Sequence, residues 1–207
     1  MGQDANKGIL DEKAAEDLIN TIQTQSDITG VKFALDIVGT TETAFEKYID
    51  FVPKHTDAPL MLDAMSPRTR MAAANLAKKM GLADRCLYNS IYKGVTDAEL
   101  ANIKESGIKM SIVLADDPKD TTLEGKMNVI IEALAMAEKA GITKPLIDTA
   151  IPAFEPDMGA SVRAISIMKE KYGHPVGLGS GNVVTTMGWV KANIAKQFRK
   201  GTVTATN

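Results

Sequence analysis

Segments with the apolar pattern of strands alternate along this chain with segments that have the apolar period of helices, and this alternation limits the fold more than any other feature. A helix is predicted over 11–27, where Asp11 is placed as an N-cap, and six strand–helix units follow it. The predicted strands cover 31–39, 59–65, 86–91, 108–115, 144–151 and 175–180, and the helices after them cover 42–52, 67–81, 97–106, 124–141, 158–172 and 183–199. Strict alternation favours a parallel sheet with right-handed crossovers. No linker divides the sequence, so we expect one α/β domain over 1–207.

Two architectures fit this order, an open doubly wound sheet and a (β/α)8 TIM barrel. A nucleotide-binding open sheet usually carries a glycine-rich turn after its first strand, but here that strand ends in DIVGTTE with the single Gly39. Polar residues instead recur where the strands end, at Asp36, Asp63, Asn89, Asp148, Ser180 and Asn182. In a barrel those ends share one central mouth, where active sites are built, so the series favours the barrel.

The predicted barrel is incomplete, because about six βα units are present where the fold has eight. The chain opens on a helix with no strand ahead of it, and after 183–199 it stops at GTVTATN. We therefore expect the first and last strands of a barrel to be missing from this sequence. A barrel without them would expose two sheet edges.

Charge and composition argue against several classes of protein. The formal net charge of −2 gives no electrostatic footprint for nucleic acid or for an acidic membrane surface. No apolar run reaches the length of a membrane-spanning helix, and the N-terminus lacks the regions of a signal peptide. The single Cys86 cannot form an internal disulfide, which fits a cytoplasmic location, and His55 and His174 are too few for a His/Cys zinc site.

Three polar residues at different strand ends carry the prediction of a binding site. Asp63, Asn89 and Asp148 converge on a mostly apolar mouth in the predicted barrel. A carboxylate accepts two parallel N–H bonds from the edge of an aminopyrimidinone, so this group of residues suits a flat, neutral heterocycle with adjacent N–H donors. The alternative is that the aspartates cap helices, although Ser66, just before Pro67, is a better N-cap than Asp63.

Other reactive side chains fit catalysis less well. No G-x-S-x-G motif is present, and both histidines lie away from the strand ends, which argues against Ser–His catalysis. Cys86 begins a strand and is interpreted as a buried apolar residue. Lys93 is interpreted as a solvated loop residue. The polar loop 115–125 is either a lid or partner contact over the mouth or a solvated loop.

The glycine-rich run GLGSGN, at 177–182, has two interpretations. Glycines before a helix N-terminus suit a phosphate. No Lys or Arg accompanies this turn, however, and we favour glycines that let a ring lie close to the backbone, with Asn182 as the working group.

A series of motifs resembles one known family. They are LDIVG, DFVPKHTDAPLMLDAMSP, GLADRCLYNSI, IVLADDPKD with a later EGK, AGITKPLIDTAI and PVGLGSGN, and they cover the chain from about Lys7 to Gly201. In this order they resemble the MtrH subunit of tetrahydromethanopterin S-methyltransferase and, equally, the methylcorrinoid:tetrahydrofolate methyltransferases. The resemblance implies a pterin-binding barrel, usually a homodimer, in the cytoplasm. Membrane insertion of the chain is not implied, and attachment to a membrane complex stays open.

The resemblance also implies an activity and the residues that perform it. Members move a methyl group between N5 of a tetrahydropterin, either tetrahydrofolate or tetrahydromethanopterin, and the cobalt of a corrinoid (cobalamin) carried by a partner protein. By similarity, the pterin edge is bound by Asp63, Asn89 and Asp148, with Asp36 as a further member and Gly179 and Ser180 beside the ring. Asn182 matches the residue near N5, so Asn182 and Asp148 are the implied catalytic residues, and no metal site is implied.

Two other functions stay open at this point. The chain is then a non-catalytic or truncated protein that docks a corrinoid protein, or a barrel that condenses a pterin pyrophosphate. The second reaction needs basic residues at the mouth for pyrophosphate, and the sequence places none well, so we rank it last.

Overall fold

The computed structural model describes residues 2–4, 6–151 and 158–181, and its main feature is a parallel sheet of six strands. The strands are β3 (Leu35–Val38), β4 (Leu60–Asp63), β5 (Cys86–Ile91), β6 (Met110–Leu114), β7 (Lys144–Asp148) and β8 (Val176–Gly177). The helices are α1 (Glu12–Thr29), α2 (Glu42–Phe51), α3 (Pro67–Lys79), α4 (Asp97–Ser106), α5 (Leu123–Lys139) and α6 (Met158–Tyr172), with the short 3-10 turns η1 (Val52–Lys54) and η2 (Ala83–Arg85). The α/β class and the parallel sheet are confirmed, while the predicted helix over 183–199 lies outside the described residues.

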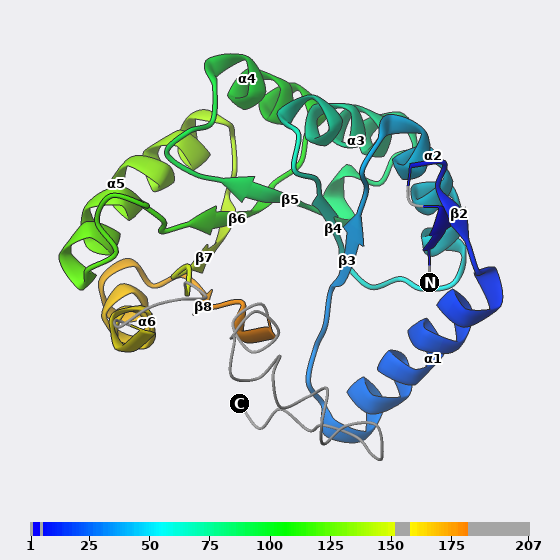
Figure 1. Ribbon diagram of the computed structural model, residues 1–207, viewed down its shortest axis with the longest axis horizontal. Coiled ribbons are helices and arrows are strands. Elements are labelled where there is room, and N and C mark those ends of the chain that lie inside the picture. The colour runs from blue at the N-terminus through cyan, green and yellow to red at the C-terminus, as the bar shows by residue number, and fades with distance from the viewer. Residues whose placement is uncertain (1, 5, 152–157, 182–207) are drawn as a thin grey trace.

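The strands lie side by side in chain order, from β3 to β8. The helices lie along the outside of the sheet, and its inner face turns toward the middle of the view (Figure 1). A doubly wound sheet reverses its strand order and places helices on both faces. The described sheet has neither feature, and its winding is that of a barrel wall. Among the described strands, β3 and β8 form the two edges.

The hydrophobic core lies between the helices and the outer face of the sheet. Strand side chains on that face are almost fully buried, among them Leu60, Leu62, Tyr88 and Val113. Side chains on the inner face, such as Met61 and Ile112, are only half-buried. Strands that are apolar nearly throughout predict cover on both faces, but in the described part of the chain the inner face keeps contact with solvent.

A short hairpin precedes α1, so the expectation that the chain opens on a helix is wrong. Strand β1 (Gly2–Asp4) pairs antiparallel with β2 (Ile9–Leu10). Strands of three and two residues are too short to show an alternating period, which is why the sequence pattern did not reveal them. The hairpin packs on α2, where the Lys47 ammonium donates to the Lys7 carbonyl over 2.6 Å.

Helix starts follow from their capping residues. The predicted cap Asp11 accepts the Ala14 amide of α1 over 3.0 Å, and threonines cap α2, α4 and α5 in the same way. Ser66 occupies the N-cap position of α3 before Pro67, but its side chain makes no capping hydrogen bond. None of the helices in the described part of the chain is both long enough and apolar enough to span a membrane.

Candidate functional site

A cleft of about 500 Å³ opens on the inner face of the sheet, toward the ends of the strands. Its polar lining consists of side chains that the sequence had singled out, Asp36, Asp63, Asn89 and Asp148. Met61, Ile112 and Leu146 supply apolar walls, and the segment from Pro175 to Gly179 closes one side. The fold therefore brings four predicted site residues and Gly179 to one place.

The strand register explains why these side chains meet. Asp63 of β4 lies directly opposite Asn89 of β5 in a parallel pair, so the two side chains share one face of the sheet. Asp148 pairs with Leu114 on one side and with Gly177 on the other. Asp36 pairs with Met61, one layer deeper than Asp63. The carboxylates thus stand on the same inner face at two depths.

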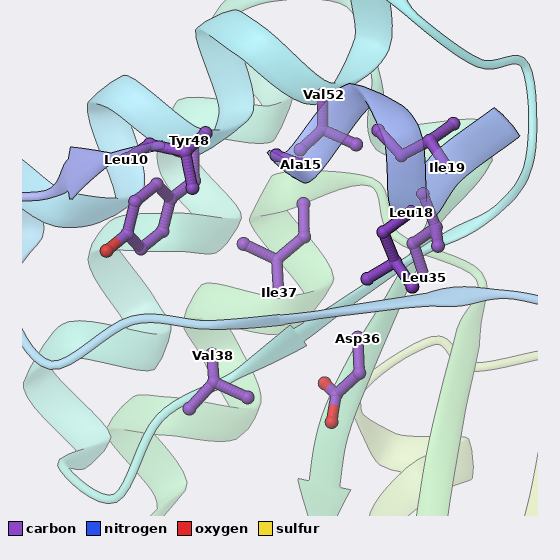
Figure 2. Close-up of a pocket in the computed structure, with 10 residues that line it drawn as sticks. All are labelled: Leu10, Ala15, Leu18, Ile19, Leu35, Asp36, Ile37, Val38, Tyr48 and Val52. Carbon is purple, nitrogen blue, oxygen red and sulfur yellow. The ribbon is translucent and has the colours of Figure 1, made fainter. Parts of the chain in front are cut away.

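Figure 2 shows that the side chains of β3 alternate between two environments. Leu35 and Ile37 point toward α1 and α2, into an apolar cavity of about 270 Å³, while Asp36 points away from it to the opposite side of the strand. Apart from Asp36 and the Tyr48 hydroxyl, that cavity is lined by aliphatic side chains. It offers few groups for chemistry, and we interpret it as a packing gap beside the edge strand.

Two neighbouring carboxylates make the deeper part of the cleft weakly acidic. Loss of water around the carboxyl, and then the charge of Asp63, raise the pKa of Asp36 from 3.8 to about 6, although its side chain is exposed at the open sheet edge. Burial also raises the pKa of Asp63, while the Arg70 guanidinium opposes this shift. The cleft therefore favours ligands that donate hydrogen bonds or carry a proton.

Asp148 is held by its own turn. The Ala150 amide donates to Asp148 Oδ1 over 2.7 Å, which engages one carboxylate oxygen in a local hydrogen bond. Burial raises the pKa of Asp148, the Ala150 amide and the Lys126 ammonium lower it, and the charge of Asp116 raises it again. The aspartate is a half-buried acceptor whose charge depends on these neighbours.

Two buried cations behind the cleft were missed by the sequence analysis. Arg70 of α3 is 5% exposed, donates through Nη1 to the Ala64 carbonyl over 2.8 Å, and pairs with Glu99 of α4 at 2.8 Å. Lys126 of α5 is 1% exposed and donates to the Ala150 carbonyl over 2.8 Å. A charged residue in a helix normally indicates a solvated position, so sequence alone held no signal for either role.

The remaining predicted residues divide into three cases. Cys86 is fully buried, as predicted, and burial raises the pKa of its thiol to about 12. Lys93 is a half-exposed loop residue that pairs with Asp117 at 3.2 Å. Ser180 is half-buried but does not line the cleft, and Asn182 lies outside the described residues, so its predicted role stays a prediction.

The described part of the chain contains no group of three or more His, Cys, Asp or Glu residues placed to hold a metal ion. What the cleft does contain is a set of hydrogen-bond acceptors, three carboxylates and one amide, between apolar walls. Such a site suits a flat polar ring whose edge carries N–H groups, because each donor meets an acceptor and the ring faces meet aliphatic side chains.

Comparisons with known proteins give the chain a family. The model of the family described as tetrahydromethanopterin S-methyltransferase MtrH subunit matches residues 1–206. Relatives named as the H subunit of tetrahydromethanopterin S-methyltransferase are 44% identical over 207 residues in Methanococcus maripaludis, 42% over 206 in Methanocaldococcus jannaschii and 36% over 208 in Methanopyrus kandleri. Each alignment covers 96% of this chain and 63%, 64% and 65% of the respective relative, so the chain spans a little under two thirds of their length.

Proposed function

This chain belongs to the MtrH family of tetrahydromethanopterin S-methyltransferase subunits, and we propose that its cleft binds a tetrahydropterin for methyl transfer to or from the cobalt of a corrinoid protein. The observation that carries the proposal is the convergence of Asp63, Asn89 and Asp148 in one cleft of about 500 Å³. The names of the relatives favour tetrahydromethanopterin over tetrahydrofolate as the pterin.

Recognition of the pterin follows from the acceptor set. The pyrimidinone edge of a pterin presents an amino group and ring N–H groups, and ionised Asp63 and Asp148 accept such donors in strong, directional bonds. Asn89, beside Asp63, offers both an acceptor and a donor to the same edge. Met61, Ile112 and Leu146 then contact the faces of the ring. Each buried carboxylate gains a donor, which offsets the cost of its desolvation.

The transfer step needs help at the leaving nitrogen. As the bond between N5 and the methyl carbon breaks, a cobalt(I) acceptor supplies the electron pair of the new cobalt–carbon bond. The pair left on N5 then needs a proton or a hydrogen bond. We assign this hydrogen bond to Asn182, which follows the glycine-rich segment on the wall of the cleft. A donor of this kind that acts in the transition state is worth about 2.7–4 kcal/mol.

Further parts of the proposal concern the assembly. We propose that the six described strands form part of a (β/α)8 barrel and that a corrinoid protein approaches the mouth at the carboxyl ends of the strands. The relatives are named as subunits, which supports partner proteins. A homodimer and a cytoplasmic location stay predictions of the resemblance.

The proposed function is tested by methyl transfer in the absence of the partner protein. The full chain is incubated with 5-methyl-tetrahydromethanopterin and free cob(I)alamin, and the formation of methylcobalamin is followed by its visible absorption. We expect turnover by the unaltered chain and a loss of about 10²-fold or more in rate for Asn182→Ala, with pterin affinity nearly unchanged.

Two results would count against this proposal. An unchanged rate in Asn182→Ala would remove the role assigned to that residue. A folded chain that binds the pterin but never forms methylcobalamin, even when a corrinoid protein replaces free cob(I)alamin, would favour the non-catalytic docking function.

A further inference from the structure

The turn that follows β7 is built around one peptide group. The Ala150 amide donates to Asp148 Oδ1 over 2.7 Å, and the Ala150 carbonyl accepts the Lys126 ammonium over 2.8 Å. The Ser161 hydroxyl of α6 reaches the same carbonyl over 3.2 Å. Side chains from two helices therefore hold the residue whose amide holds the carboxylate.

The backbone at this residue is unusual. Ala150 has φ of 50°, the one positive φ among the non-glycine residues of the described chain. A residue with a β-carbon adopts this left-handed conformation at a cost of roughly 1–2 kcal/mol. Hydrogen bonds from Lys126 and Ser161 to the carbonyl compensate for that cost, because they favour the backbone orientation in which the Ala150 amide faces Asp148.

A lysine is a costly choice for a bond that a hydroxyl already makes. Lys126 is 1% exposed, and a buried ammonium is expensive unless an anion lies near it. Asp148 is such an anion, and the ammonium favours its ionised form against burial and against the charge of Asp116. What Lys126 adds beyond Ser161 is therefore its positive charge.

We propose that Lys126 is a positioning residue for Asp148: it fixes the Ala150 backbone that orients the carboxylate, and it supplies the charge that keeps this carboxylate an anion in the cleft. The inference rests on the proposed function where it concerns pterin binding. The effect of Lys126 on Asp148 itself does not depend on any ligand.

The test is a carbon-13 NMR titration of the Asp148 carboxyl in the full chain, assigned with Asp148→Asn. In Lys126→Met, we expect the Asp148 midpoint to move to higher pH, because burial and Asp116 then act without the opposing cation. Asp36 and Asp63 also face this cleft and are unchanged in the comparison. Lys126→Arg keeps the charge and should restore the midpoint toward its original value.

A matched control is Lys139→Met, since Lys139 lies on the same helix but is 64% exposed and pairs with Asp97 on the surface. This variant should leave the Asp148 titration where it was. An Asp148 midpoint that stays unchanged in folded Lys126→Met would overturn the proposal, whether or not the chain binds a pterin.

Pterin binding gives a second measurement. At neutral pH, Lys126→Met should bind tetrahydromethanopterin about tenfold more weakly, and raising the pH should restore the affinity as Asp148 ionises. A defect of packing alone would not recover with pH. If the unaltered chain binds no pterin, the proposed function fails, while the Asp148 titration still decides the role of Lys126.

Loss of folding is also informative. If Lys126→Met does not fold, Lys126→Gln, which keeps an amide donor for the Ala150 carbonyl, takes its place in the titration. If neither folds, the double variant of Lys126→Met with Asp148→Asn decides the matter. Recovery of folding there would support a Lys126–Asp148 couple, and a double variant that stays unfolded would overturn it.

Discussion

At the scale of single residues, the acidity of the cleft leads to a prediction about stability. The pKa of Asp36 is raised from 3.8 to about 6 by desolvation and by the charge of Asp63. Below this window both the folded and the unfolded chain hold the proton. As the pH rises through it, the unfolded chain releases the proton first, so the free energy of unfolding falls.

We therefore expect Asp36→Asn to remove part of the stability loss between about pH 4 and pH 7. Because the side chain is exposed, solvent screening keeps the effect small. The measurement is urea unfolding of both chains across this range. If the two stability curves ran parallel, Asp36 would titrate at its ordinary pKa.

The residue scale also shows which parts of the site sequence reasoning reaches. Asp63, Asn89 and Asp148 were predictable because each ends an apolar strand, and parallel strands bring their ends together. Arg70 and Lys126 were not, because nothing in the local pattern distinguishes a buried helical cation from a solvated one. Their roles depend on partners 29 and 24 residues away in the chain.

At the scale of elements, one ion pair joins α3, α4 and β5 behind the cleft. The Arg70 guanidinium lies 2.8 Å from Glu99 Oε1, and the Tyr88 hydroxyl donates to the same oxygen. Both charged side chains are almost fully buried, at 6% and 1% exposed. Arg70 also donates to the carbonyl of Ala64, which follows Asp63, so the network connects helix packing to the site.

Removing one charge from this network should be costly. We expect Glu99→Gln to lower the free energy of unfolding by about 3–5 kcal/mol, because Arg70 is left buried without its anion. Glu42→Gln is the matched control, since the Arg68–Glu42 pair is exposed at the surface and should contribute about 0–1 kcal/mol. Equal losses in the two variants, measured by denaturant unfolding, would show that burial does not strengthen the internal pair.

Element boundaries were predictable where local chemistry decides them. The ranges 97–106 and 158–172 agree with α4 and α6 at both ends, and the range 86–91 agrees with β5. Strand β3 is shorter than the predicted 31–39, because pairing with β4 covers only Leu35 to Val38. Apolar residues indicate where a strand is able to form, whereas its length depends on the neighbour with which it pairs.

At the scale of the whole molecule, the winding of the sheet could be inferred from the alternation of elements, but its closure could not. The amides of Leu35 and Gly39 donate to carbonyls of Pro59 and Asp63, on the β4 side of β3. The alternation of a parallel strand directs the amides of Asp36 and Val38 to the other side. Among the described strands, that side of β3 is a sheet edge.

Hydrogen exchange measured by NMR on the full chain tests this edge. We expect the amides of Asp36 and Val38 to exchange much faster than those of Leu35 and Gly39, because the latter pair is hydrogen-bonded within the sheet. Slow exchange at Asp36 and Val38 would show instead that another segment pairs with β3 in solution.

The central claim is that the cleft between β3 and β8 binds a pterin through its acidic side chains. Calorimetric titration of the full chain with tetrahydromethanopterin tests it directly, with Asp63→Asn and Asp148→Asn as site variants and Asp97→Asn as a surface control that is 87% exposed. We predict binding that each site variant weakens about tenfold or more, since a hydrogen bond to a charged acceptor contributes roughly 1.5–3 kcal/mol, and that the control leaves unchanged. Equal affinity in all four chains, or no binding by a folded unaltered chain, would contradict the claim.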